Sequence, residues 1–296
     1  MSGIVRLGID GVCVMLIFDL FDLDDKIEIM DIGASAMTEV PIYKFLLEKQ
    51  MAFLTAFDGD ARQITAIENA YGKDFVTVLN YFLFDGGKHD VYLCSPASGM
   101  SSLYKPKTEA LEYFNGFSKF GEVQSIEKIQ TTRLDDIDNV KSPDFLKMDV
   151  QGAELEIIKN GKNKLKDCLA IQLEVSYFNL YEKQPSFGEV DVYLRELGFI
   201  PHMFLDVKRW AIAPTIFNGN FRVPGNQLLE SDIVYVKNPL SLSELNVVQL
   251  KKLAILAHYS FKSFDFCVRL LIELERREVC DVNSHKQYLL NIKNFD

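Results

Sequence analysis

Alternation of apolar strand-like segments with helical segments is the feature that most constrains the fold of this chain. Segments rich in β-branched and aromatic residues occur at 26–33, 51–58, 74–84, 145–150 and 169–175. Helix-like segments lie between them at 40–50 and 60–71, and another follows at 189–199. Such alternation predicts an α/β fold, a mostly parallel sheet with helices on both faces. Two later segments, 202–207 and 231–238, are suited to antiparallel pairing.

Two local signals make this prediction more specific. Pro41 suits the first position of the helix at 40–50, because its fixed φ matches the helix and its missing N–H costs nothing there. The sequence Asp85-Gly86-Gly87-Lys88 is typical of a tight turn. It therefore predicts a β-hairpin that joins strand 74–84 to the next segment, 89–94.

The pattern changes after residue 240. Residues 241–259 and 264–279 have the apolar spacing of amphipathic helices. We therefore predict a Rossmann-like domain over 1–240 and a C-terminal helical extension over 241–296. The extension has three possible roles at this point: a lid, a buttress, or an arm that forms a homodimer.

Composition excludes several classes of partner. The formal net charge of −10 argues against a chain that grips nucleic acid or an anionic membrane. The longest apolar run, at 11–18, is too short to cross a bilayer. Five scattered cysteines without CxxC spacing predict free thiols, a reducing cytoplasmic location and no zinc site.

Ligands of open α/β sheets bind at the carboxyl ends of the strands, so acidic residues there are site candidates. Asp31 and Gly33 close the first strand, and Asp58 closes the second, 25 residues after Gly33. An acid at that spacing typically binds ribose hydroxyls. The G-x-G-x-x-G sequence of pyrophosphate sites is absent, which favours S-adenosylmethionine over a dinucleotide. The alternative is structural: Asp31 caps the loop and Gly33 only turns it.

Two further groups are weaker candidates. Asp85 can bind an adenine amino group, or it can simply stabilise a turn. Ser101 and Ser102 lie on a polar loop at 95–106 that can cover a substrate, although loops of this composition are usually only solvated.

The stretch FLKMDVQGAELEIIKNG, residues 145–161, carries two charges in an otherwise buried strand. Lys147 and Asp149 point to one face, and Glu174 closes the neighbouring strand about 5 Å away. Such a carboxylate pair can act as a general base or hold a divalent cation. No third ligand stands out, so we expect no required metal. The alternative is an ion pair of Lys147 with Asp149 or Glu174. Glu154 is interpreted as compensating the helix dipole.

Several stretches resemble the FkbM-type S-adenosylmethionine-dependent methyltransferase family. They are DFLKMDVQGAELEIIKNG, LEVSYFNLYEKQPSFGEVDVYLRELGF and QLLESDIVYVKNP, and the resemblance covers residues 27–238. It implies a class I methyltransferase fold, a seven-stranded sheet whose last strand is antiparallel. It also implies methyl transfer, mostly to a hydroxyl of a sugar or a secondary metabolite.

The resemblance also implies roles for individual residues. Asp31, Gly33, Ala34 and Asp58 would line the cofactor, together with Ser35, which stands where the family usually has asparagine. Asp149 and Glu174 would face the methyl acceptor, and we place Gln151 on the same side. Asp58 is shorter than the usual glutamate, and the proline that follows it in the family is missing.

Two functions follow from these patterns. In the first, the protein is an O-methyltransferase in which Asp149 is the general base, Glu174 orients the acceptor and Lys147 tunes both carboxylates. Its acceptor would be a small molecule or a glycan. In the second, the altered glycine loop marks a protein without turnover, a scaffold that binds partners through its helical extension.

Overall fold

The structure is a computed structural model that describes residues 17, 20–23, 25–34, 40–58, 67–68, 72, 74–95 and 98–292. The chain divides into two compact units. One contains Glu28–Glu39 and Phe53–Asn238, and the other contains Met1–Ile27, Val40–Ala52 and Pro239–Asp296. Residues 40–52, which the predicted domain 1–240 includes, therefore group with the C-terminal helices.

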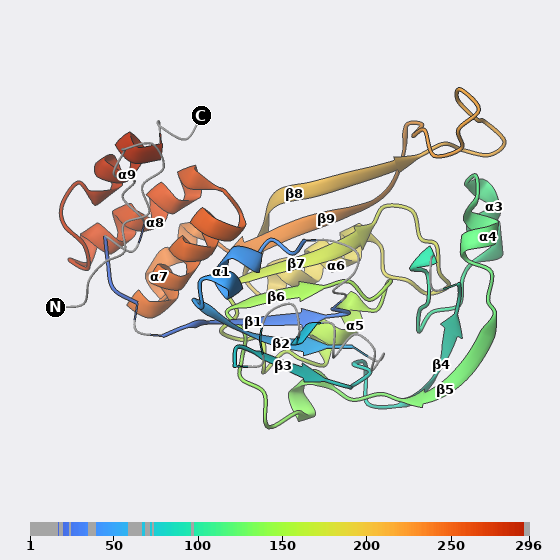
Figure 1. The fold of residues 1–296 in the computed structure, drawn as a ribbon, viewed down its shortest axis with the longest axis horizontal. Helices are drawn as coiled ribbons and strands as arrows, with labels where there is room; N and C mark the ends of the chain where they lie inside the picture. Colours follow the sequence, from blue (N-terminus) through green and yellow to red (C-terminus); the bar gives the residue numbers. More distant parts are fainter. Residues whose placement is uncertain are drawn as a thin grey trace. The chain divides into compact units, whose positions relative to one another are not determined.

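A seven-stranded sheet, in the order β3-β2-β1-β6-β7-β9-β8, forms the centre of the first unit (Figure 1). Its strands are β1 (Ile27–Ile32), β2 (Ala52–Phe57), β3 (Val76–Leu79), β6 (Phe145–Met148), β7 (Ala170–Ser176), β8 (Phe199–Trp210) and β9 (Gln227–Lys237). The neighbouring pairs β1–β6, β2–β3 and β6–β7 are parallel. Strand β9 lies between β7 and β8 and is antiparallel to both. The predicted α/β class I methyltransferase fold, with its antiparallel last strand, is confirmed.

The predicted hairpin at Asp85–Lys88 is wrong. Strand β3 pairs with β2 in the main sheet, whereas β4 (Lys88–Leu93) pairs with β5 (Ser125–Gln130) in a separate two-stranded ribbon. Asp85 does form a tight turn, since its Oδ1 accepts the Gly87 N–H at 2.7 Å and contacts His89 Nε2 at 2.7 Å. Turn composition predicted the bend, but it carries no information about which strand is the partner.

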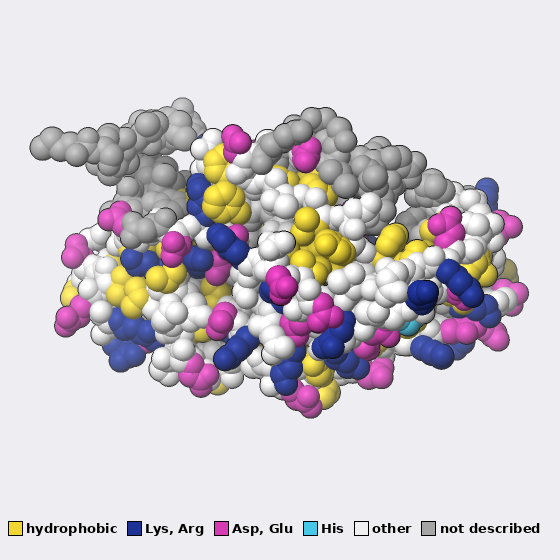
Figure 2. Space-filling model, turned by 90° about the horizontal axis from the view of Figure 1, so that it is seen from below, with side chains coloured by type: hydrophobic (Ala, Val, Ile, Leu, Met, Phe, Trp, Pro, Cys, Tyr) yellow, Lys and Arg dark blue, Asp and Glu magenta, His cyan; other side chains and the backbone are white. Residues whose placement is uncertain are grey.

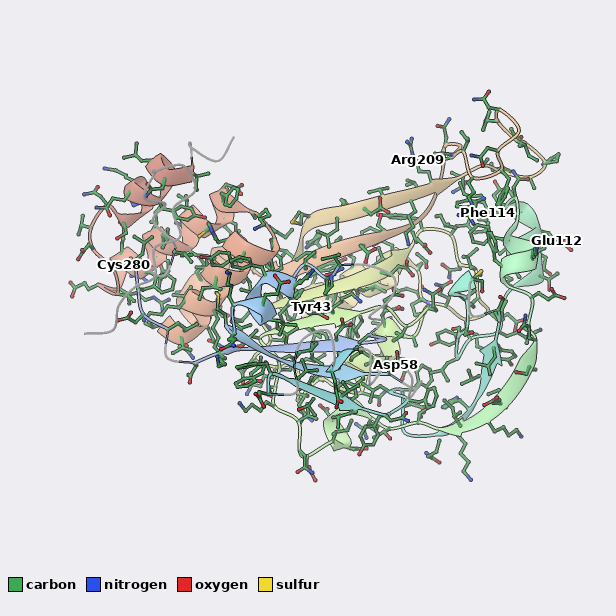
Figure 3. All side chains as sticks on the ribbon, in the orientation of Figure 1. Tyr43, Asp58, Glu112, Phe114, Arg209 and Cys280 are labelled. Carbon is green, nitrogen blue, oxygen red and sulfur yellow. The ribbon has the colours of Figure 1, made fainter. Side chains whose placement is uncertain are left out.

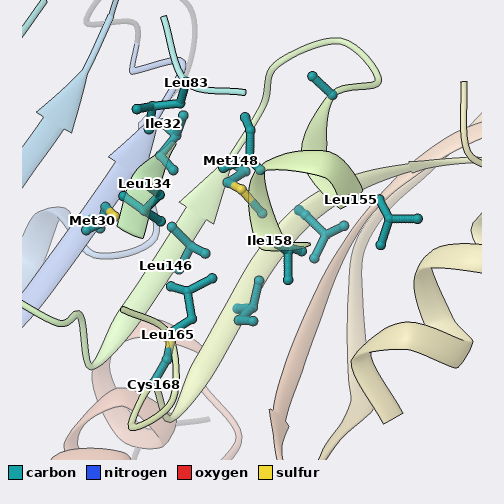
Figure 4. Packing of buried hydrophobic residues seen from close by; sticks show 14 of the residues in the cluster. Met30, Ile32, Leu83, Leu134, Leu146, Met148, Leu155, Ile158, Leu165 and Cys168 are labelled. Carbon is teal, nitrogen blue, oxygen red and sulfur yellow. The ribbon is translucent and has the colours of Figure 1, made fainter. Parts of the chain in front are cut away.

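The two faces of the central strands differ. Met30, Leu146 and Ile171 are register neighbours on one face, where they join the main apolar core. Helices α5 (Glu154–Lys159) and α6 (Phe187–Glu196) contribute to this core, part of which is shown in Figure 4. The other face carries a polar row in which Asp31 lies opposite Lys147 and Lys147 lies opposite Gln172. The alternation predicted for residues 145–150 is therefore present.

Among its described residues, the sheet unit also contains α3 (Thr108–Tyr113), α4 (Phe117–Phe120) and the 3₁₀ turn η3 (Leu134–Asp136). Residues 60–71, predicted as a helix, lie almost entirely outside the described residues. The four described cysteines, Cys94, Cys168, Cys267 and Cys280, are free thiols.

The second unit is helical and confirms the amphipathic pattern of the C-terminal sequence. It contains η4 (Pro239–Glu244), α7 (Val247–Ile255), the π-helical η5 (Leu256–Ser260), α8 (Phe264–Arg276) and α9 (Ser284–Ile292). It also contains α1 (Lys44–Glu48), where Phe45 stacks on Tyr259 at 4.7 Å between ring centroids. Helix α1 begins three residues after Pro41, so proline is not its first residue as predicted. Within the described ranges, every helix is too short or too polar to traverse a bilayer.

Candidate active site

The candidate site lies where β1 and β6 end side by side. From β1 the chain adds β2 and then β3 on one side of this pair, and after β6 it adds β7 on the other side. The direction in which successive strands are added therefore reverses between β1 and β6. Crevices at such switch points are the usual ligand sites of open α/β sheets. Gly33 and Ala34 follow β1, and Asp149 follows β6, with the Asp149 N–H donating to Ile32 O at 3.0 Å.

Gly33 has a structural reason to be glycine. Its φ is +79°, and a Cβ built on it would lie 2.0 Å from the backbone oxygen of Asp149. Its N–H donates to Phe57 O at 2.9 Å. Close approach of the β1 end to the β6 end therefore excludes any side chain at this position. The predicted turn role of Gly33 is supported, and its contact with a cofactor stays a prediction.

We expect Gly33→Ala to destabilise the sheet unit by roughly 1–3 kcal/mol more than a glycine replacement that meets no atoms. The reason is the clash with the Asp149 carbonyl, which needs backbone movement. The matched control is Gly198→Ala, because Gly198 has φ +82° and no atom within 4 Å of its built Cβ. Urea unfolding followed by the fluorescence of Trp210, the single tryptophan, measures the difference. Equal losses in both variants would contradict the close approach.

Gln151 connects most of the predicted acceptor-side residues. Its Nε2 lies 3.0 Å from Asp149 Oδ1 and 3.3 Å from Glu174 Oε2. Its Oε1 accepts from the Tyr181 hydroxyl at 3.0 Å, and its backbone oxygen accepts from Ser102 Oγ at 2.7 Å. The structure thus brings Asp149, Gln151, Glu174 and Ser102 together, as one hydrogen-bonded group. Glu174 lies two residues before the end of β7, not at its last position as predicted.

Glu174 is buried and has charged neighbours on the two C-terminal strands. Lys208 Nζ on β8 lies 3.1 Å from Glu174 Oε1 and 2.9 Å from Glu230 Oε1 on β9. Burial, Glu230 and Asp149 raise the pKa of Glu174 well above its usual range, against the opposing charge of Lys208. Burial lowers the pKa of Lys208, but Glu174 and Glu230 outweigh it, so that pKa is raised. Burial and the neighbouring acids therefore disfavour the ionised form of Glu174, and Lys208 supports it.

Lys147 contacts a different carboxylate from those that the sequence suggested. Its Nζ lies 3.3 Å from Asp31 Oδ1, and the Asp31 side chain is only 4% exposed. Burial lowers the pKa of Lys147, but the charges of Asp31 and Asp149 outweigh it and raise that pKa overall. The structural alternative, an ion pair of Lys147 with Asp149 or Glu174, is also not what forms, since the partner is Asp31. Asp31 is thereby buried in the sheet, next to the predicted cofactor edge.

Glu154 has more than a dipole-compensating role. It is 4% exposed, and its Oε1 accepts from the N–H groups of Val150 and Gly152 at 3.1 and 3.3 Å. Gly152, with φ +102°, permits the turn that makes these contacts. Burial raises the pKa of Glu154 to about 7. This carboxyl therefore orders the turn that carries Gln151.

The other predicted residues are separate from this group. Asp58 follows β2 and its N–H donates to Leu79 O at 3.3 Å, so it lies at the carboxyl edge of the sheet (Figure 3). Ser101 Oγ accepts from Cys94 N–H at 3.1 Å and stabilises its own loop. Burial opposes ionisation of Asp85, but hydrogen bonds from Gly87 and His89 outweigh it and lower its pKa, as suits a turn residue. Ser35 lies outside the described residues.

Three residues of the group were not found from the sequence: Tyr181, Lys208 and Glu230. Lys208 and Glu230 are register partners across β8 and β9. The sequence predicted that 202–207 pairs with 231–238 but gave no register, and irregularities between Pro201 and Met203 and between Phe204 and Asp206 shift it. Tyr181 lies on the loop after β7, and no local signal marks it.

A groove of about 340 Å³ lies beside the β4–β5 ribbon, lined among others by Tyr92, Lys105, Leu111, Glu112, Val123 and Ile126. It contains none of the predicted site residues. Across the ranges that the structure describes, no three His, Cys, Asp or Glu side chains are grouped to bind a metal ion. The carboxylates of the site are instead engaged by Gln151 and Lys208.

The donor set of this sheet edge suits one kind of cofactor. Asp58 and Asp149 are carboxylates that follow β2 and β6, and Glu174 lies near the end of β7. Lys147 and Lys208 are already paired with acids. Carboxylates attract a cationic sulfonium and can bind ribose hydroxyls, whereas they repel a pyrophosphate. The described residues therefore fit S-adenosylmethionine better than a dinucleotide.

Residues 38–201, more than half of the 296-residue chain, match the family described as Methyltransferase FkbM domain. A comparison with curated proteins finds no match. The chain is similar to a putative methyltransferase from Thermoplasma acidophilum, with 10% identity, a TM-score of 0.35, and 73% of this chain and 70% of that one covered. It is also similar to magnesium protoporphyrin IX methyltransferase from Synechocystis, with 8% identity, a TM-score of 0.37 and coverage of 72% and 71%. An uncharacterized protein from Listeria monocytogenes matches with 9% identity, a TM-score of 0.36 and coverage of 90% and 91%.

Proposed function

The chain belongs to the methyltransferase FkbM domain family, and we propose that it transfers the methyl group of S-adenosylmethionine to a hydroxyl oxygen of a sugar, a glycan or a secondary metabolite. The observation that supports an oxygen acceptor is the pair of carboxylates, Asp149 and Glu174, that both accept from Gln151 Nε2 at the sheet's switch point. Hydroxyl acceptors are weak acids, so their attack needs a group that accepts a proton.

The cofactor supplies an activated methyl group on a positively charged sulfur. Asp58 would bind the ribose hydroxyls from the end of β2, and Gly33 and Ala34 would line the adjacent turn. Asp31 lies on β1 just before that turn, and its ion pair with Lys147 would hold the end of the strand in place. Asp85 is not assigned to the adenine, because its turn engages it fully.

Asp149 is the proposed general base. Its side chain is exposed at the carboxyl edge, whereas that of Glu174 is 9% exposed and bound to Lys208. The acceptor oxygen would attack the methyl carbon while its proton passes to an Asp149 carboxylate oxygen. The new C–O bond would form as the C–S bond of the bound cofactor breaks, with neutral S-adenosylhomocysteine as the leaving group. Glu174 would orient the acceptor, and Gln151 and Ser102 would hold the edge in place.

Charge supports an acceptor other than nucleic acid. The net charge is −10, and Figure 2 shows acidic and basic side chains interspersed over the face that it presents. Nucleic-acid sites instead need a continuous basic surface that neutralises phosphates. A neutral small molecule or glycan is therefore the proposed acceptor.

Calorimetry with S-adenosylhomocysteine tests cofactor binding directly. We expect the wild-type protein to bind, and Asp58→Ala to raise the Kd by about tenfold or more, because it removes charged hydrogen bonds to the ribose. Asp90→Ala is the control, since Asp90 is an exposed carboxylate on β4, away from this edge. The absence of binding by the wild type would favour the alternative, a scaffold protein without turnover. An unchanged Kd for Asp58→Ala would remove Asp58 from the site.

A further inference from the structure

Gln151 has a backbone conformation that its residue type disfavours. Its φ is +55°, in the left-handed region, and it is followed by Gly152 with φ +102°. Residues with a Cβ pay roughly 1–2 kcal/mol there, and glycine or asparagine usually occupies such positions. If the turn after β6 needed only its shape, glycine would serve better. The longer amide side chain therefore has a use that offsets this cost.

The contacts of Gln151 show which way its amide points. Asp149 Oδ1 and Glu174 Oε2 are acceptors when ionised, and both lie near Nε2, at 3.0 and 3.3 Å. The Tyr181 hydroxyl lies 3.0 Å from Gln151 Oε1 and 3.3 Å from the backbone oxygen of Met100. Burial followed by the charge of Glu174 raises the pKa of Tyr181, so the hydroxyl keeps its proton and donates it to the nearer oxygen, Gln151 Oε1. One orientation of the amide satisfies all three contacts. Tyr181 therefore fixes which end of Gln151 faces the carboxylates.

The amide bridges two acids without adding charge. Glu174 is held from its other oxygen by Lys208, which is itself bound to Glu230. Asp149 has a different environment, because it is exposed and lies beyond the last residue of β6. Gln151 thus connects an exposed carboxylate to a rigid, buried one. A carboxylate in place of the amide would add a third negative charge to the same space.

The backbone of Gln151 is held as well. Ser102 Oγ donates to Gln151 O at 2.7 Å and accepts from the Tyr104 N–H at 3.0 Å. Ser102 is 4% exposed and pairs with Tyr92 across an isolated bridge. The strained turn is therefore secured by the loop before α3 and by Tyr181 after β7. A base that must meet a substrate hydroxyl needs such fixed geometry.

We propose that Gln151 is a positioning residue for the reaction, which holds the Asp149 carboxylate toward the acceptor by linking it to Glu174 and Tyr181. This inference rests on the proposed function, in which Asp149 accepts the proton. Gln151 does not itself exchange a proton, since an amide neither gains nor loses one at neutral pH. Its effect passes through the orientation and ionisation of the two carboxylates.

The first test replaces Gln151 with glycine. Gln151→Gly suits the positive φ and removes only the amide, so we expect it to fold with unchanged or higher stability. The kcat for S-adenosylhomocysteine release, measured on a panel of neutral mono- and oligosaccharides, should fall by about ten- to a hundredfold. The KM for S-adenosylmethionine should stay within about twofold, because the cofactor side is unaltered. Asn218→Gly is the control for glycine at a positive φ, since Asn218 has φ +52° on an exposed loop.

Gln151→Glu gives a second readout that a purely structural role would not move. A third carboxylate disfavours ionisation of its neighbours, so the acid limb of the kcat profile should move to higher pH by about one unit. Wild-type kcat in Gln151→Gly together with a wild-type pH profile in Gln151→Glu would overturn the inference. If Gln151→Glu does not fold, the kcat of Gln151→Gly decides, and a wild-type value then overturns the inference.

A carbon-13 titration of the carboxyl groups separates this inference from the proposed function. The charged groups around Glu174 are Glu230, Asp149, Lys208 and Glu154, and Gln151→Gly leaves all of them in place. Loss of the amide donor should therefore raise the titration midpoint of Glu174 by about one pH unit. If the wild type binds no S-adenosylhomocysteine in calorimetry, the proposed function fails while this titration still reports on Gln151. An unchanged midpoint would overturn the positioning role.

Discussion

Replacement of Asp149 by asparagine is expected to lower kcat by about 10²- to 10⁴-fold, the usual contribution of a general base. The change is nearly isosteric. An asparagine Oδ1 can still accept the Gln151 amide hydrogen that now bonds Asp149 Oδ1 at 3.0 Å. The turn should therefore keep its shape while the group that receives the acceptor's proton is lost. Release of S-adenosylhomocysteine, measured with the neutral sugar that gives the highest wild-type rate, reports the loss.

Two measurements show that this loss concerns chemistry and not folding. Calorimetric binding of S-adenosylhomocysteine should be unchanged in Asp149→Asn, and so should urea unfolding followed by Trp210. Asp206→Asn is the matched control, because it makes the same change at an exposed carboxylate on β8. The Asp206 side chain accepts from the N–H of the next residue, Val207, at 2.8 Å. A kcat in Asp149→Asn within threefold of wild type would assign the proton transfer to another group.

The architecture of the sheet could be predicted because it depends on local patterns. Alternating faces are visible in residues 145–150, where Leu146 and Met148 join the core and Lys147 does not. Parallel strands separated by helices leave few topologies, and the pairing of β8 with β9 follows from their adjacency in the chain. Family resemblance then supplied the position of the antiparallel strand. These inferences needed no knowledge of side-chain contacts.

The hairpin at Asp85 failed for a physical reason. Asp85 satisfies its own turn through Gly87 and His89, and these contacts are the same whichever strand lies beyond. Strand β4 instead pairs with β5, which begins more than thirty residues later in the chain. A tight turn predicts a change of direction, and only tertiary packing selects the partner.

The candidate site could be predicted only in part, for a similar reason. Adjacent strand ends place Asp149 near Glu174 whatever the loops do. Ion partners depend on longer-range packing, so Lys147 pairs with Asp31, and Lys208 reaches Glu174 from β8. The burial of a side chain also cannot be predicted from its neighbours in sequence. Glu154 stands at a helix start, where an acid usually is exposed and compensates the helix dipole, yet it is buried.

Burial of Glu154 has a consequence for stability that depends on pH. Its pKa is about 7 in the folded protein, against an ordinary value of 4.5. Because the folded-state pKa is raised, its contribution to stability is complete below pH 4.5 and is lost as the pH rises through 7. The difference corresponds to about 3 kcal/mol. Glu154→Gln cannot ionise and keeps an oxygen that accepts from Val150 and Gly152.

We therefore expect Glu154→Gln to gain about 3 kcal/mol relative to wild type between pH 4 and pH 8, with most of the gain between pH 4.5 and 7. Urea unfolding followed by Trp210 fluorescence at several pH values measures it. Glu174 titrates in both proteins, but the charge of Glu154 is one of the causes that raise its pKa. Removal of that charge in Glu154→Gln eases the ionisation of Glu174, which adds to the gain in the same direction. Glu156→Gln removes a charge from the same helix at a side chain that is 32% exposed, and it should show a much smaller gain. If both variants follow wild type in parallel, Glu154 does not titrate in this range, and the turn that carries Gln151 is held by a permanently ionised carboxylate.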